Sequence, residues 1–436
     1  MEVQTAVSGP ALAAPPPGSD GAEVERGTRA AALTWVLLVA LALWWGSRSI
    51  AGHGIGIDAA PLVGRWTWHA TWGLLAPVVV AGLVVAVGPR AAATLRWARV
   101  PLAAGSAASV WALSLAASDG WARVTAPLLT RHEYEPFAES ITSPGGFLEH
   151  FIERLPSTPI HVQGHPPGAP LVPWLLDRLA LGGAGWFAAV VILGWGLAVA
   201  SALVAARHVA GEAAARRAAP ALVLLPAAVW AGTSADALFA GVLGVAIALA
   251  LVGRRALAAG AAFGVALMLT YGAVAVAVIP AVVLASQRRW SSLALLAGGG
   301  LAVLLAVDLA TGFSWMDGLR ATHRAYYAGI AADRPAPYFA LVGNPAALAL
   351  AAGPAVAVGL AAVIRRWRDA SSVLPLAAFG AVALANLSLL SKGEVERIWL
   401  PFIPWLALAA PGNRRGWLAA QAALAVALQA GLRSKW

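Results

Sequence analysis

The longest polar stretch of the chain, residues 118–183, contains the residues best suited to acid–base chemistry. Glu133 and Glu135 flank Tyr134 within the sequence Thr-Arg-His-Glu-Tyr-Glu. A carboxylate here could be a general base that takes a proton from a hydroxyl group, if a nearby cation such as Arg131 tunes its pKa. We expect Glu133 to be the base and Glu135 the alternative, with Tyr134 and Arg131 contacting substrate. Two solvated carboxylates on an exposed turn would explain the same spacing.

Two histidines mark the second half of this stretch. His161 and His165 precede the sequence Pro166-Pro167-Gly168. Consecutive prolines fix the backbone and keep the residue before them out of the helical region, so we expect His165 to be held rigidly against a substrate. Metal ligation is the alternative, because histidine is a common metal ligand. The sequence specifies no cofactor, and a divalent metal is left open.

A second polar segment, residues 311–340, carries a pair of arginines beside two tyrosines. Arg320, Arg324 and Tyr327 follow one another at helical spacing, and Tyr326 is adjacent. Such an arginine pair could bind a phosphate through paired hydrogen bonds, while the two tyrosines position the rest of the substrate. The alternative is an interfacial helix whose arginines and aromatic rings lie at the level of the lipid headgroups.

The third candidate segment is the densest charge cluster in the late part of the chain. Lys392, Glu394, Glu396 and Arg397 lie between two apolar runs. Ionisable residues at a membrane edge are costly and usually functional, so we expect these four to contact substrate. A structural knot of salt bridges with no net charge is the alternative.

Composition decides what kind of molecule must position these residues. Hydrophobic residues make up 60% of the chain, charged residues only 11%, and mean hydropathy is +0.75. A soluble domain carries about 25% charged residues, so this chain could not cover a water-facing surface. It is predicted to be all-α, a polytopic transmembrane helical bundle. Cysteine is absent, which excludes disulfides, thiolate metal sites and cysteine nucleophiles.

The basic residues indicate topology rather than nucleic-acid binding. The net charge is +10 and the pI is near 11. The arginines, however, form short clusters between apolar runs, which is the pattern that the positive-inside rule produces. We therefore expect a lipid bilayer as partner and no nucleic acid.

The apolar runs predict two regions. Residues 1–29 are expected to be a disordered cytoplasmic tail, and residues 30–436 a transmembrane domain of about 11–13 spans. The long run 256–286 is expected to turn near 270–272 and so to cross twice. The expected spans are 30–45, 69–88, 99–117, 184–206, 218–232, 236–252, two within 256–286, 293–310, 341–364, 372–390, 397–411 and 416–432.

Threading these spans places the arginine clusters on one side, taken as the cytoplasm of a cell-membrane protein. These clusters lie at 90–99, 207–217, 254–255, 288–289, 365–368 and 414–415. The N-terminus is then cytoplasmic, and the large loop 118–183 is extracytoplasmic together with loops 46–68, 311–340 and 391–397. The three candidate segments all fall on the outer side.

The large outer loop is predicted to contain short helices of its own. Ser143 and Pro144 form a helix start, with serine as the N-cap and proline in the first turn. Phe147, Phe151 and Leu155 then recur at helical spacing, which predicts an amphipathic helix lying on the membrane surface.

Together these features resemble the GT-C superfamily of polytopic glycosyltransferases, in the neighbourhood of the protein mannosyltransferase and aminoarabinose transferase relatives. Three motifs carry the resemblance: the acidic outer loop with Glu133-Tyr134-Glu135, the turn His165-Pro166-Pro167-Gly168, and the late segment from Lys392 to Arg397, which is similar to that of actinobacterial members. The family usually has aspartate where this loop has glutamate, and usually one span before the loop where three are predicted here.

The resemblance implies an enzyme that transfers a sugar from a polyprenyl-phosphate carrier to a lipid, glycan or protein acceptor of the cell envelope, on the outer face. Two other hypotheses fit the same composition. A transporter or flippase of lipid-linked sugars would carry functional charges at mid-membrane depth, and a non-catalytic envelope-assembly protein would not depend on Glu133 or Lys392.

Overall fold

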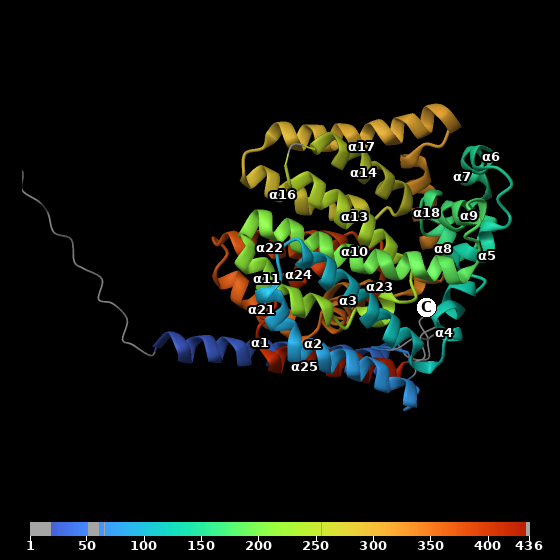
Figure 1. Cartoon of the computed structure of the whole chain (residues 1–436). Coiled ribbons are helices and arrows are strands. Elements are labelled where there is room, and N and C mark those ends of the chain that lie inside the picture. Colours follow the sequence, from blue (N-terminus) through green and yellow to red (C-terminus); the bar gives the residue numbers. More distant parts are fainter. Residues whose placement is uncertain (1–18, 51–60, 65, 254, 433–436) are drawn as a thin grey trace, which may run out of the picture.

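The computed structural model describes residues 19–50, 61–64, 66–253 and 255–432, and its regular elements are helices. The predicted polytopic helical bundle is therefore confirmed (Figure 1). Six of the described helices are long and apolar enough to cross a membrane, or up to seven if a bent pair counts as one span, and three shorter apolar helices accompany them. This is fewer than the 11–13 spans expected from the sequence.

The first helix corrects the predicted tail. Helix α1 (Ser19–Ser49) begins well before residue 30, so residues 19–29 are helical rather than disordered, and residues 1–18 lie outside the described residues. The expected span 69–88 is shifted towards the C-terminus, because α2 starts only after the short 3₁₀-helix η1. The elements that follow are η1 (Trp72–Leu74), α2 (Leu75–Thr94), α3 (Arg99–Ala116) and η2 (Ala117–Asp119).

Helix α10 (Ala184–Ala210) runs through the middle of the bundle and packs against α3 and α13 (Asp236–Leu251) (Figure 1). Glycine permits these close packings. A Cβ atom on Gly105 would lie 2.7 Å from the carbonyl oxygen of Gly196, and one on Gly241 would lie 2.5 Å from that of Gly194. The backbones therefore meet directly, which fixes where the first residues of α13 are presented.

Prolines break two of the expected spans. The run 218–232 is divided between α11 and α12 around Pro226, and the run 397–411 is divided between α23 and α24 around Pro401. Proline removes a backbone donor and disfavours helix at the preceding residue, which explains why these runs are apolar yet short. The elements are α11 (Glu212–Val223), α12 (Ala228–Ala231), α23 (Val395–Ile398) and α24 (Ile403–Ala407).

The predicted turn near 270–272 is confirmed, since α14 ends at Leu269 and α15 begins at Ala273. A second bend was not predicted. Helices α20 and α21 meet at 105° around Gly353, whose φ of 86° suits glycine. Buried Gln421 closes this bend by accepting from the Ala355 amide and donating to the Ala352 carbonyl. The helices are α14 (Ala256–Leu269), α15 (Ala273–Val276), α16 (Val278–Ser286), α17 (Trp290–Thr311), α20 (Asn344–Ala352), α21 (Pro354–Arg365), α22 (Ala370–Leu387) and α25 (Arg415–Gly431).

The large loop folds into short helices against the bundle. Ser143 caps α6 as predicted, accepting from the Gly146 amide at 3.3 Å. The prediction that the apolar face of α6 and α7 lies on a membrane surface was wrong. Phe147 and Phe151 are buried against one another, and Phe151 packs against Phe313. The loop elements are α4 (Ala122–Thr125), η3 (Ala126–Leu129), α5 (Tyr134–Ala138), α6 (Pro144–Glu149), α7 (Phe151–Arg154), η4 (Leu155–Ser157), α8 (Ile160–Gln163) and α9 (Gly168–Arg178).

A further group of short elements follows α17 and returns the chain to the bundle at the same end as the large loop (Figure 1). It comprises α18 (Trp315–Ala328), η5 (Ile330–Asp333), α19 (Ala336–Tyr338) and the π-helix η6 (Phe339–Gly343). Ser314 caps α18 by accepting from the Asp317 amide.

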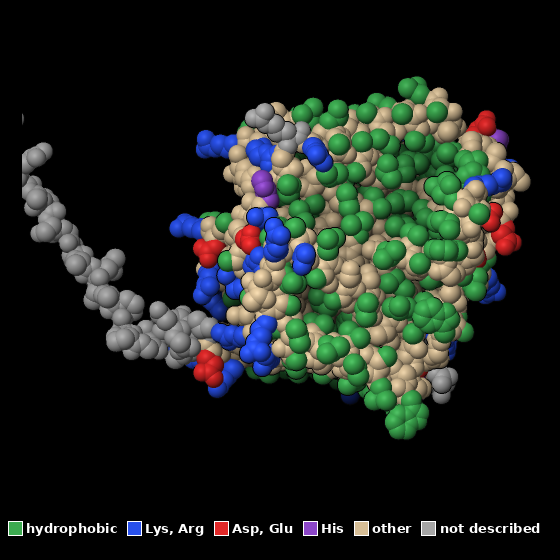
Figure 2. Space-filling view, in the orientation of Figure 1, with side chains coloured by type: hydrophobic (Ala, Val, Ile, Leu, Met, Phe, Trp, Pro, Cys, Tyr) green, Lys and Arg blue, Asp and Glu red, His purple; other side chains and the backbone are tan. Residues whose placement is uncertain are grey.

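At the opposite end of the bundle, arginines from different clusters donate hydrogen bonds to carbonyl groups at the ends of helices. Arg216 donates to the carbonyls of Ala92 and Leu95 at 2.6 and 2.9 Å, and Arg289 donates to that of Leu251 at 3.0 Å. These carbonyls belong to the C-terminal ends of α2 and α13, where cations are stabilising. Figure 2 shows the densest group of basic side chains along the left margin, with scattered basic side chains on the right near the loop helices.

Candidate functional site

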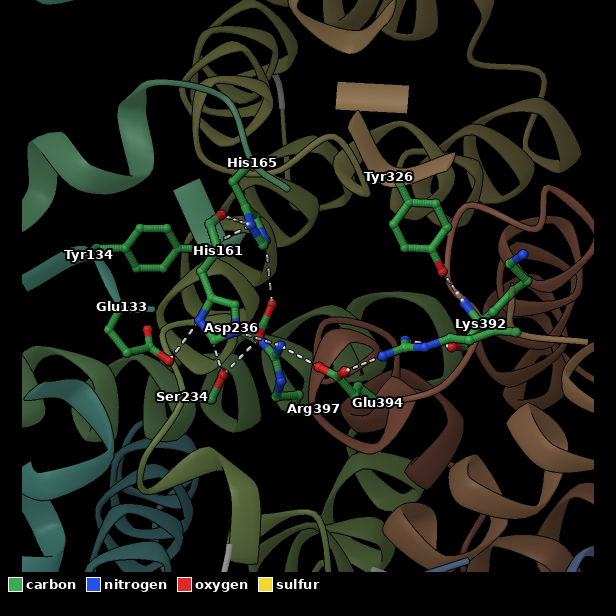
Figure 3. A network of polar contacts seen from close by, with 11 residues as sticks. Glu133, Tyr134, His161, His165, Ser234, Asp236, Tyr326, Lys392, Glu394 and Arg397 are labelled. Atoms are coloured by element: carbon green, nitrogen blue, oxygen red, sulfur yellow. Dashed lines mark hydrogen bonds and ion pairs between the residues drawn. The ribbon is translucent and has the colours of Figure 1, made fainter. Parts of the chain in front are cut away.

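Three segments that are far apart in the sequence converge at the loop end of the bundle (Figure 3). The hydroxyl of Thr322 on α18 donates to the carbonyl of Gln163 on α8 at 2.8 Å. The backbone amide of Lys392 donates to the Tyr326 hydroxyl at 2.7 Å. Arg397 reaches His161 at 3.1 Å. The large loop, the 311–340 segment and the 391–397 segment therefore form one site.

Glu133 is held at the inner edge of the site by a histidine. Oε1 of Glu133 lies 2.8 Å from Nδ1 of His161, and Nε2 of the same ring lies 3.1 Å from a guanidinium nitrogen of Arg397. Glu133 is 4% exposed and Arg397 is 6% exposed. The amide of His161 also donates to the carbonyl of His132, which ties α8 to the residue just before Glu133. The carboxylate is therefore fixed on a buried framework.

Arg397 is the hub of this network. It donates to Oδ2 of Asp236 at 3.1 Å and to Oε2 of Glu394 at 2.8 Å, in addition to its contact with His161. Asp236 begins α13 and accepts a hydrogen bond from the Ser234 hydroxyl at 2.7 Å. Burial opposes a charge on Arg397, but the carboxylates of Glu394, Asp236 and Glu133 raise its pKa above the ordinary arginine value.

Glu394 joins the hub to a second buried arginine. Its other carboxylate oxygen accepts from Arg334 at 3.1 Å, and Arg334 also donates to the carbonyl of Lys392 at 2.8 Å. Burial alone would raise the pKa of Glu394, but Arg397 and Arg334 hold it below the ordinary value. Glu394 has a φ of 60°, in the left-handed region, and the preceding Gly393 donates to Asn344 at 3.0 Å. This tight turn aims Glu394 between the two arginines.

Tyr134 and His165 lie on the other side of Asp236. The Tyr134 hydroxyl is 2.8 Å from Nδ1 of His165, which also lies 2.9 Å from the carbonyl oxygen of His161. Nε2 of His165 faces Oδ1 of Asp236 at 3.9 Å. Burial raises the pKa of Tyr134 and lowers that of His165, so both side chains are held in their neutral forms at neutral pH.

Lys392 is buried like the two arginines, but its side chain contacts an aromatic ring rather than a carboxylate. Its ammonium lies 4.8 Å from the centre of the Tyr327 ring and points away from Glu394 (Figure 3). Burial, followed by the charge of Arg334, lowers the pKa of Lys392. The Tyr327 hydroxyl donates to the Leu389 carbonyl at 3.0 Å. This contact holds the ring under the ammonium.

Glu396 is 4% exposed and is not among the ion pairs found in the described part of the chain. Burial raises its pKa to about 7, and Glu394 adds to that increase. It is therefore the carboxyl group in the late segment that exchanges a proton near neutral pH.

Arg320 and Arg324 line a pocket beside the network rather than joining it. The pocket has a volume of about 350 Å³ and is lined by Leu319, Arg320, His323, Arg324 and Leu390. Arg320 is exposed and pairs with Asp317 at 2.8 Å. The ring of His323 packs on that of Tyr327 with centroids 4.7 Å apart, so the pocket adjoins the Lys392 end of the site.

Two residues singled out from the sequence lie outside this arrangement. Arg131 is exposed, and its Nε donates to the ring of the neighbouring His132 at 3.4 Å. Glu135 lies on α5 and is partly exposed; burial and then Glu139 raise its pKa. Adjacency to Glu133 in the chain does not bring either side chain to Arg397.

The structure also adds residues that the sequence did not assign to the site. Asp236 and Ser234 come from the start of α13, and Arg334 comes from the segment after α18. The available signals were weak: an acid at the first position of an apolar helix, and an arginine before a proline in a polar loop. In the described part of the chain, no group of three or more His, Cys, Asp or Glu side chains is placed to hold a metal ion.

Among solved structures, the chain is similar to ArnT from Cupriavidus metallidurans in its apo state, with a TM-score of 0.41 and 19% sequence identity. The similarity covers 62% of this chain and 54% of that chain, so it spans about half of the length of that protein. No protein-family model matches the sequence, and no curated protein matches it.

Proposed function

We propose that this chain is an integral-membrane glycosyltransferase that moves a sugar from a polyprenyl-phosphate carrier to a cell-envelope lipid, glycan or protein acceptor. One observation carries the proposal. A buried carboxylate, Glu133, is held by a histidine that is itself bonded to buried Arg397, and it lies at the same end of an apolar helical bundle as an arginine-lined pocket. The three motifs that resemble the GT-C superfamily all contribute residues to that end.

Glu133 is the proposed base. The acceptor hydroxyl gives its proton to the Glu133 carboxylate while its oxygen forms a bond to the anomeric carbon of the sugar. The bond from that carbon to the phosphate oxygen breaks, and its electron pair leaves with the polyprenyl phosphate. The phosphate is a good leaving group, so a second carboxylic acid of the kind that glycosidases use is not needed.

The pocket beside α18 is the proposed position of the carrier phosphate. Arg320 and Arg324 project into it, and guanidinium groups suit phosphate because they can donate paired hydrogen bonds. Its volume of about 350 Å³ lies at the lower end of the range of small-molecule sites. Leu319 and Leu390 complete the lining, so the pocket also offers apolar surface to the first part of a prenyl chain.

The remaining site residues are assigned to substrate positioning. Lys392 and Tyr327 lie between the pocket and the carboxylate network, and Tyr326 supports the backbone of Lys392. A lipid-linked donor reaches such a site laterally from the bilayer. The densest group of basic side chains lies at the opposite end of the bundle (Figure 2). Under the positive-inside rule, this supports an extracytoplasmic site end.

The test is transfer of a labelled sugar from polyprenyl-phosphate sugars in proteoliposomes. Glu133→Gln keeps the shape of the side chain and removes the base, so we expect about a 10²–10⁴-fold loss of kcat. Glu135→Gln is the matched control and should retain most of the activity. Full activity in both variants would eliminate the base assignment.

The side of the membrane is tested separately. The chain has no cysteine, so His150→Cys introduces a single thiol on a side chain that is 45% exposed. A membrane-impermeant thiol reagent should label this variant on intact cells. Labelling only after lysis would place the site in the cytoplasm and would contradict a donor on the outer face.

A further inference from the structure

The ring of His161 is the link between Glu133 and the Arg397 hub. Nδ1 faces the Glu133 carboxylate at 2.8 Å, and Nε2 faces a guanidinium nitrogen of Arg397 at 3.1 Å. His161 is 9% exposed, and its partners are buried as well. Each ring nitrogen therefore lies within hydrogen-bond distance of a partner whose own role is fixed by its chemistry.

Those partners leave one arrangement of hydrogens on the ring. A guanidinium group carries only donors, so Nε2 must accept and cannot carry a hydrogen. An ionised carboxylate carries only acceptors, so Nδ1 must donate. The ring is then neutral with its hydrogen on Nδ1. A hydrogen on Nε2 would oppose an Arg397 donor at 3.1 Å.

We infer that Arg397 fixes the tautomer of His161 and that His161 is the positioning residue of Glu133. Its Nδ1–H hydrogen bond orients the carboxylate. The hydrogen stays on His161 throughout the reaction. This inference rests on the proposed function for its consequence in catalysis, whereas the tautomer itself follows from the geometry alone.

Arg397 suits this role because its other contacts prevent it from turning. Asp236 and Glu394 each accept from it, at 3.1 and 2.8 Å. The guanidinium plane is thus fixed from two sides, and the donor aimed at His161 keeps its direction. The network around Arg397 therefore orients Glu133 indirectly, through the ring of His161.

Two substitutions separate the two halves of the ring. His161→Asn places an amide nitrogen near the position of Nδ1, so it keeps a donor for Glu133 and loses the link to Arg397. His161→Gln places its amide near Nε2, so it keeps an acceptor for Arg397 and loses the donor for Glu133. We expect His161→Asn to retain kcat within about tenfold of the wild type and His161→Gln to lose about 10²-fold, as for a defect in acid–base catalysis.

The split between kcat and KM distinguishes positioning from loss of structure. The loss should fall on kcat, with the KM for the donor and the unfolding temperature little changed, and it should be larger in His161→Gln than in His161→Asn, because only the latter still donates to the carboxylate. His150→Asn is the matched control, since the His150 ring contacts the Gly146 carbonyl in its own helical turn and the neighbouring Glu149. Equal losses of kcat in the two His161 variants, or losses that fall on KM, would overturn the positioning role.

A readout without substrate tests the tautomer. Nitrogen-15 NMR of histidine-labelled protein should show a neutral ring with a protonated Nδ1, and either His161 variant identifies its signal by loss. In the unaltered chain, a short contact between a histidine Nδ1–H and a glutamate carboxylate should report the same bond. A neutral ring protonated at Nε2 would overturn the inference. If this signal is as expected and the wild type transfers no sugar, the proposed function fails and the tautomer stands.

Discussion

The site contains two pairs of arginines in opposite situations. Arg334 and Arg397 are buried, and their donors are directed to carboxylates and to the backbone of the protein itself. Arg320 and Arg324 line an open pocket, where Arg320 has one exposed partner, Asp317. The first pair holds the protein together and orients Glu133. The second pair has donors to offer a ligand. Under the proposed function, residues of the same charge therefore hold the fold together in one place and bind substrate in the other.

Substitution of Arg397, the hub of the buried network, should have the largest effect on stability. Arg397→Met leaves Asp236 buried without its arginine and Glu394 with one of its two arginines, and breaking a buried pair in this way costs about 3–5 kcal/mol. We expect a large fall in the unfolding temperature in detergent, measured by tryptophan fluorescence, together with loss of transfer. Arg320→Met is the control at an exposed position and should unfold at the wild-type temperature. Equal stability of the two variants would show that the buried network is not structural.

Substitution of Arg320 or Arg324, which line the pocket, should affect donor binding rather than stability. Arg320→Met and Arg324→Met each remove a charged donor from the pocket, worth about 1.5–3 kcal/mol when it bonds a phosphate. We expect the KM for the lipid-phosphate donor to rise by about tenfold or more in each variant, with kcat and the unfolding temperature little changed. Steady-state kinetics with varied donor would measure this. A fall in kcat at constant KM would place the phosphate elsewhere.

Glu396 provides a smaller effect with a defined pH dependence. Its pKa is raised from 4.5 to about 7 in the folded chain, so between these values the unfolded chain binds fewer protons than the folded one. Stability should therefore fall as pH rises through this window and level off above it. Glu396→Gln should match the wild type near pH 4.5 and exceed it by about 3 kcal/mol at pH 8, since each unit of pKa shift is worth about 1.4 kcal/mol.

Thermal unfolding across pH 4.5–8 checks the sign of this effect, and Glu149→Gln, at an exposed position in the large loop, is the control. A Glu396→Gln variant that is less stable than the wild type at pH 8 would mean that Glu396 is ionised and paired in the folded protein.

Local signals in the sequence predicted the local structure well. The limits of α3 and α13, the turn at 270–272 and the Ser143 cap each depend on a few neighbouring residues. Apolar runs divided at prolines were the main failure, because hydropathy counts residues and ignores a missing backbone donor. The surface placement of α6 and α7 was also wrong, since amphipathic periodicity does not tell lipid from protein as the partner of the apolar face.

The site was predictable only where its residues are close in sequence. Glu133, Glu394 and Arg397 each belong to a charged cluster that sequence reasoning could find. The positions of Asp236 and Arg334 depend on how α13 and the segment after α18 pack, which no local pattern encodes. Arg131 illustrates the reverse: it is next to the acidic pair in the chain, yet it points outward in the fold.

The arginines at the far end of the bundle have a consequence for how the protein reaches its orientation. Arg216 bonds Glu212 through two nitrogens and the end of α2 through a third. Membrane insertion depends only on the positive charge of this residue, and lysine carries the same charge. The folded bundle needs the forked shape of the side chain, which lysine lacks. Under the proposed orientation, one side chain thus serves both membrane topology and closure of the helix end, and Arg216→Lys should give a chain that inserts correctly and folds poorly.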